Sequence, residues 1–174
     1  MISYRSDGCL MRHPRHVVML VSAIGAVACG DRGRQAASAD TTFVRMQARG
    51  AVVMGVNQYT SAHVFEDLPD GGRIILDTDE DSVAVARIRQ HMRDIAMAFA
   101  AGDFTQPFQV HAEQVPGTAV MAARSARIAY QAIDRPRGAE VRIVTTDPTA
   151  VSAVHAFLAF QRGAHHAAGH EAMP

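Results

Sequence analysis

The 174-residue sequence contains no lysine and only two cysteines, Cys9 and Cys29. Neither cysteine belongs to a CxxC pair, and both precede any plausible core. This excludes a zinc ribbon, a thioredoxin-type site and a disulfide framework in the folded part. The 17 basic residues, all arginine, balance 17 acidic residues. With no net positive charge and no basic stripe, the chain has no electrostatic basis for binding nucleic acid.

The sequence also lacks the motifs of the common enzyme classes. It has no GxSxG elbow, no GxxxxGK[ST] loop, no GxGxxG after a strand and no HExxH helix. We therefore do not expect an enzyme. An enzymatic alternative would need a concave site that holds His111 or His155 beside a carboxylate such as Glu113.

Residues 1–28 have the pattern of a bacterial signal peptide, with Met11 as the expected start. Two arginines precede the apolar run 17–28, which is too short to span a bilayer as a helix. A small-residue cleavage site ends directly before Cys29, which predicts a lipoprotein acylated at Cys29. Ala26 stands where a lipobox usually has Leu, Val or Ile. Cleavage without lipidation, or an uncut anchor or buried helix, therefore remains an alternative.

The expected cellular localisation follows from this N-terminal pattern. Acyl chains on Cys29 would anchor the protein in a membrane, and Gly30 after the cysteine favours the outer membrane. We expect the periplasmic side of the envelope, with plain secretion into the periplasm as the alternative. The membrane is the one partner predicted, and no protein partner is indicated. Residues 29–41 are expected to be the lipidated cysteine and a flexible tether, 42–163 a single domain, and 164–174 a mobile His-rich tail.

Two stretches of the domain repeat the order strand, turn, strand, helix. Alternating apolar residues predict the strands, Gly-containing turns predict hairpins, and an apolar stripe predicts each helix. We expect an α+β fold in which two ββα units form a four-stranded antiparallel sheet with the helices packed on one face. The expected strands are 62–66, 73–78, 127–133 and 140–145, and the expected helices are 80–101 and 148–162.

Capping residues set the expected ends of these helices. Asp79 is expected to cap the first and Asp147 the second, with Gly102 and Gly163 after their last turns. Outside the two units, we expect a shorter helix over 43–54 interrupted by Gly50, an extended segment over 102–117 and a helical turn over 118–125.

Several short motifs resemble an uncharacterised family of bacterial envelope and secreted proteins. They are Gly102-Asp103-Phe104 with Pro107, His111 and Pro116-Gly117, and the closing His155-x-Phe157-Leu158-x-Phe160-Gln161. The resemblance covers about residues 45–166. The family has no established activity, so the resemblance implies a real domain and no particular function.

Histidine is the chemically notable residue of the domain. Seven of the nine histidines follow Cys29, where no further thiol is present. Imidazole ligands suit copper or zinc. We therefore predict a transition-metal-binding module that uses His63, His111, His155 and His91. The alternative is a structural or partner-binding lipoprotein without a small ligand, in which these histidines are merely packed.

The tail carries three more histidines, His165, His166 and His170. Clustered imidazoles on a mobile segment bind Cu²⁺, Ni²⁺ or Zn²⁺ opportunistically. We expect such a tail site to be separate from the domain, or the segment to be a solvated, frayed terminus.

Overall fold

The structure is a computed structural model that describes residues 30–54 and 60–167, with side chains over 41–53 and 60–167. The predicted signal peptide, Cys29 and His170 lie outside the described residues. In chain order the elements are α1 (Gly30–Met54), β1 (Ser61–Leu68), β2 (Gly71–Thr78), α2 (Ser82–Ala100), α3 (Thr105–His111), α4 (Thr118–Ala123), a 3₁₀ turn (Ser125–Arg127), β3 (Ala129–Arg135), β4 (Gly138–Val144) and α5 (Pro148–His165).

The α+β fold is confirmed. Four antiparallel strands form one sheet in the order β1-β2-β4-β3. Helix α2 packs on β3 and β4, whereas α5 packs on β1 and β2. Each long helix therefore covers the hairpin of the other ββα unit, so neither unit can bury its apolar face alone.

The sheet has approximate twofold symmetry. His63 pairs with Leu76 in the first hairpin, and 67 residues further along Tyr130 pairs with Ile143 in the second. Ile74 pairs with Val141 across the junction of β2 and β4, and this pair is related by the same shift. The two halves thus place corresponding residues in corresponding environments, which allows one half to be compared with the other.

The core lies between the sheet and the two long helices. Alternation along β2 and β4 directs Leu76, Val141 and Ile143 inward, and all three are almost fully buried. Ile88 of α2 and Val154 of α5 meet them with no exposed surface. Burying such side chains contributes about 1.5–3 kcal/mol each relative to leaving them exposed.

Three expectations for the segments outside the two ββα units are wrong. The expected tether over 30–41 and the helix over 43–54 form one helix, α1, because the segment is rich in the helix formers Ala, Arg and Gln. Gly50 does not interrupt it. This residue is buried on the helix that packs against α3. The segment 102–117 contains the helix α3, which begins where the Asp103 carboxylate accepts a hydrogen bond from the Thr105 amide at 2.8 Å.

Helix α5 also runs further than expected. Asp147 caps it and Pro148 begins it, as predicted. However, the helix passes through Gly163, where a side chain would meet nothing within 4 Å, and ends at His165. His166 takes the left-handed conformation after the last turn, with φ of 50°. The boundary expected between the domain and a mobile tail at residue 164 is therefore wrong as far as residue 167.

The N-cap of α2 gives a direct test of these assignments. Asp81, not Asp79, accepts the amides of Val83 and Ala84, each at 3.0 Å. We expect Asp81→Ala to lower the free energy of unfolding by about 1 kcal/mol. Asp79→Ala removes an exposed ion pair with Arg137 and should cost less than about 0.5 kcal/mol. Urea denaturation of both variants checks the difference, and a larger loss for Asp79→Ala would place the cap at Asp79.

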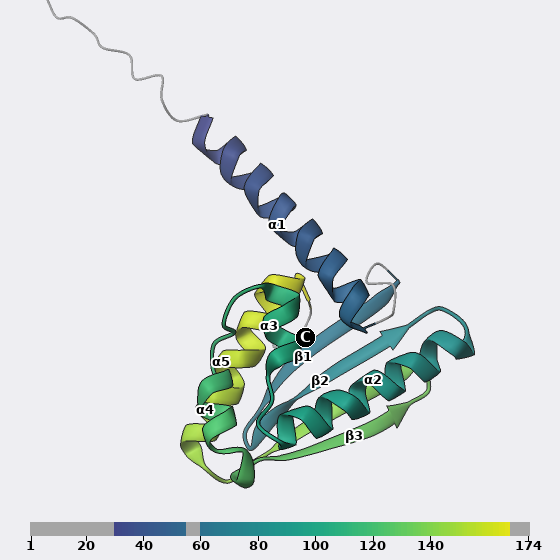
Figure 1. Cartoon of the computed structure of the whole chain (residues 1–174), viewed down its shortest axis with the longest axis vertical. Helices are drawn as coiled ribbons and strands as arrows, with labels where there is room; N and C mark the ends of the chain where they lie inside the picture. Colours follow the sequence, from purple (N-terminus) through teal and green to yellow (C-terminus); the bar gives the residue numbers. More distant parts are fainter. Residues whose placement is uncertain (1–29, 55–59, 168–174) are drawn as a thin grey trace, which may run out of the picture.

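Helix α1 leaves the rest of the molecule as a rod (Figure 1). Among the described side chains of α1, residues 41–53, the buried Met46, Gln47 and Gly50 lie against the domain. The Arg49 Nε donates a hydrogen bond to the Val110 carbonyl oxygen of α3 at 2.7 Å. These contacts position α1 and α3 against each other at one end of the sheet, beside the last turn of α5 (Figure 1).

Candidate functional site

A cavity of about 70 Å³ lies between the β1–β2 hairpin and the helices α2, α3 and α5. Its walls are mostly apolar and include Phe65, Leu76, Ile95 and Phe99. Four histidines from four different elements also line it, as do two glutamines. A buried water requires at least about 10–15 Å³ of such space. The cavity therefore has room for an ion with a few waters or for a very small molecule.

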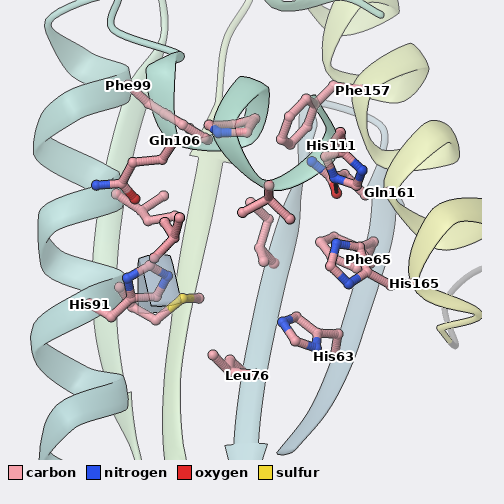
Figure 2. A pocket seen from close by; sticks show the side chains of 16 residues that line it. His63, Phe65, Leu76, His91, Phe99, Gln106, His111, Phe157, Gln161 and His165 are labelled. Carbon is pink, nitrogen blue, oxygen red and sulfur yellow. Dashed lines mark hydrogen bonds between the residues drawn. The ribbon is translucent and has the colours of Figure 1, made fainter. Parts of the chain in front are cut away.

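Three imidazoles meet on one side of this cavity (Figure 2). The ring centres of His63 and His165 are 4.9 Å apart, and those of His165 and His111 are 5.2 Å apart. His63 comes from β1, His111 from the last position of α3 and His165 from the last position of α5. Segments about fifty residues apart along the chain thus bring three nitrogen-bearing rings together.

Gln161 fixes the tautomer of His111. The side-chain oxygen of Gln161 and the Nε2 of His111 are 2.8 Å apart. An amide oxygen only accepts, so Nε2 carries the proton and the lone pair of His111 is on Nδ1. Gln161 is itself buried on the apolar stripe of α5 with Val154 and Leu158. A polar residue on this stripe thus serves to orient an imidazole.

The opposite wall belongs to α2. His91 lies there, across the cavity from His63 (Figure 2), and is 8% exposed. The buried thioether side chain of Met92 lines the same cavity. From α3, Gln106 contributes a buried side-chain oxygen that has no hydrogen-bond partner. An unpaired buried acceptor at a cavity wall is a position where a bound group can donate a hydrogen bond.

All four cavity histidines have lowered pKa values. Burial lowers the pKa of His165 to about 3, with further repulsion from His63, His111 and His166. Burial, and then His91, lower the pKa of His63 to about 4. Burial also lowers the pKa of His91, against the attraction of Asp94. The pKa of His111 is lowered by burial, although its hydrogen bond to Gln161 opposes the shift. Neutral rings therefore line the cavity at pH 7, each with one free lone pair.

The symmetric half of the molecule shows which residues hold the corresponding positions. Tyr130 corresponds to His63, and Phe99, counted from the helix caps Asp81 and Asp147, corresponds to His165. The Phe99 and Tyr130 rings meet edge to face at 5.8 Å. Phe104 and Phe157 complete a packed aromatic cluster around Phe99. The fold thus accepts plain aromatic rings where the first hairpin has histidines.

His155 does not belong to the cavity. Its Nε2 bonds to the Leu68 carbonyl oxygen at 2.9 Å, at the far end of β1 from His63. His155 lies on α5 as expected, but ten residues of helix, about 15 Å, separate it from His165. The hypothesis that His155 is a ligand together with His63, His111 and His91 is therefore corrected.

His165 takes the place expected for His155. It had been predicted to belong to a separate tail site, yet the extended α5 turns it into the cavity. His166 is exposed and stacks on Phe43 of α1, with ring centres 4.4 Å apart. The carboxylate of Glu113, required by the enzymatic alternative, is exposed and does not line the cavity.

Two absences among the described residues limit the possible sites. In residues 30–54 and 60–167, no three His, Cys, Asp or Glu side chains are already arranged to hold a metal ion. Within the same ranges, no helix is long and apolar enough to cross a membrane.

The fold and site define a small α+β domain with a mostly apolar cavity that four histidines line. Comparison with protein-family models, with curated proteins and with solved structures finds no match. The resemblance to an envelope protein family therefore stays a prediction.

Proposed function

We propose that this protein is an envelope binding module that takes a transition-metal ion through His63, His111 and His165. The observation that carries the proposal is the spacing of the three rings, 4.9 and 5.2 Å between centres. Two imidazoles bound to one tetrahedral ion at about 2.0–2.1 Å from each nitrogen have ring centres about 5 Å apart. Two of the three pairs, His63–His165 and His165–His111, are already at this spacing.

The electrostatics of the cavity support the same proposal. A metal ligand must be deprotonated, and protons compete with the metal when the ligand pKa is high. Burial keeps the pKa of His63 and His165 far below neutrality, so these rings need release no proton to bind an ion. Gln161 supplies the outer-shell hydrogen bond that typically orients a metal-bound histidine.

The predicted cellular localisation is consistent with a metal-binding module. Lipidation of Cys29 would hold the domain on the periplasmic side of the envelope, where exogenous metal ions arrive. This localisation rests on the sequence pattern of residues 1–29 alone, and the metal proposal does not depend on it.

Equilibrium dialysis against Cu²⁺ and Zn²⁺ tests the proposal. We expect one ion bound per chain, and the double variant His63→Phe, His165→Phe should weaken binding by at least about 100-fold, because even outer-shell changes at metal sites cost 10- to 100-fold. Phenylalanine keeps a flat ring at positions whose symmetric counterparts hold Tyr130 and Phe99, so this variant should still fold.

Two controls separate the cavity from other imidazoles. His155→Phe makes the same chemical change outside the cavity and should leave binding unchanged. Removal of residues 168–174 takes away His170 but keeps His165, and should also leave binding unchanged. Binding that disappears with residues 168–174, or that survives the double variant, would show that the cavity histidines are only packed.

A further inference from the structure

The cavity offers a ligand set without negative charge. Among the described residues, its lining contains imidazoles, two amides and the thioether of Met92, but no carboxylate and no thiolate. Asp94, Glu113 and Arg49 influence the cavity histidines electrostatically without lining the cavity. The residues that line the cavity would therefore leave the charge of a bound ion uncompensated.

Charge then decides between ions that accept imidazole. The cost of burying an ion in apolar surroundings rises with the square of its charge, so a dication costs about four times as much as a monocation of the same size. Carboxylate or thiolate ligands offset that cost in many zinc sites. Here the ligands are neutral and the walls are apolar, which favours a monovalent ion.

Coordination number gives a second, independent argument. Zinc in structural sites is bound almost always by four protein ligands, and zinc in catalytic sites by three protein ligands and a water. In this cavity only the His63–His165 and His165–His111 contacts bring imidazoles to about 5 Å. Monovalent copper is a soft d¹⁰ ion that accepts two or three ligands and favours thioether and imidazole donors. The buried thioether side chain of Met92 lines the same cavity, on the opposite wall formed by α2.

Resting on the proposed function, we infer that the ion this cavity selects is Cu(I), held by His63 and His165 with His111 as a third ligand, in preference to Zn(II). Selection follows from the missing negative charge and the low number of ligands. No electron transfer is needed, because the ion enters and leaves in the same oxidation state.

Competition titrations with the whole protein test the inference. Under anaerobic conditions with ascorbate, Cu(I) is titrated against the chromogenic chelator bicinchoninate. In a parallel titration, Zn(II) is measured against a zinc-sensitive dye. Both ions are d¹⁰, so the comparison reports the effects of charge, softness and coordination number without a ligand-field preference. We expect Cu(I) to bind at least about 100-fold more tightly than Zn(II), and the His63→Phe, His165→Phe variant to lose this Cu(I) binding. His155→Phe is the matched control and should keep it.

The possible failures are distinguishable. Zn(II) binding that equals or exceeds Cu(I) binding, and is lost in the double variant, would overturn the choice of ion while leaving the metal-binding function intact. If neither ion responds to the double variant while its circular dichroism and unfolding transition show a folded protein, both the inference and the proposed function are wrong.

Discussion

The protein should lose roughly 4 kcal/mol of its free energy of unfolding between pH 7 and pH 5, because His63 and His165 protonate in the unfolded chain but not in the folded one. Their pKa values fall from 6.5 in the unfolded chain to about 4 and about 3 in the folded protein. A group whose folded-state pKa is lowered in this way favours unfolding as soon as the pH drops below its unfolded value. The loss begins near pH 6.5 and continues to about pH 3–4.

Urea denaturation at several pH values measures how the free energy of unfolding changes with pH. The window from pH 7 to pH 5 separates the effect from the carboxylates Asp70, Asp103 and Asp147, whose pKa values are lowered from 3.8. The His63→Phe, His165→Phe variant should lose the part of the dependence that these two rings contribute and keep the part from His91 and His111, whereas His155→Phe should retain all of it. A wild-type slope near zero would mean that the two rings are not buried as described, and would remove the electrostatic support for the metal site.

Phe157→Ala should destabilise the protein by about 3–5 kcal/mol. Phe157 is 1% exposed, and its ring meets Phe99 at 5.8 Å and Phe104 at 6.5 Å, both at steep angles. Its truncation removes the contacts that hold α5 to the end of α2, and it opens a void beside the histidine cavity. For a domain of this size, the change is a large part of the total stability.

Phe108→Ala is the matched control for this prediction. Phe108 belongs to α3 but is 54% exposed, so its loss should change the free energy of unfolding by less than about 0.5 kcal/mol. Thermal or urea unfolding of both variants gives the comparison. Similar losses in the two variants would contradict the packing of α5 against the aromatic cluster.

The sheet was predictable because its signals are local. Period-two alternation and Gly-containing turns define each hairpin within about twenty residues, and Asp147-Pro148 marks the start of α5. The order of the strands was not predictable, because both hairpins have the same pattern and either strand of each could have met the other. The pairing of Ile74 with Val141 depends on burial of both inner faces at once.

The site was harder to predict than the fold, for reasons visible in single residues. His63 was expected to share a face with Phe65, and the two rings do stack, with centres 5.7 Å apart. His111 belongs to a seven-residue helix that is too short to show helical periodicity. Phe108 and Val110, which precede it at alternate positions, give the pattern of a strand. The position of His165 in the cavity could not be predicted, because a glycine such as Gly163 is typical of the residue that follows the last turn of a helix. In the structure this glycine lies on an open side of α5, and the helix continues. No motif marks Gln106 or Met92, whereas Gln161 on an apolar stripe was a usable signal.

The long helix α1 has a further consequence for how the cavity is presented. Between Gly30 and Phe43, whose ring stacks on that of His166, thirteen residues rise by about 1.5 Å each, or roughly 20 Å in all. If the acylated terminus at Cys29 sits in a bilayer, this stalk holds the cavity well clear of the lipid headgroups. Transfer of a bound ion to another protein would then occur at a fixed distance from the membrane. Shortening this helix by whole turns would bring the domain closer to the membrane by about 5.4 Å per turn, without changing what the cavity binds.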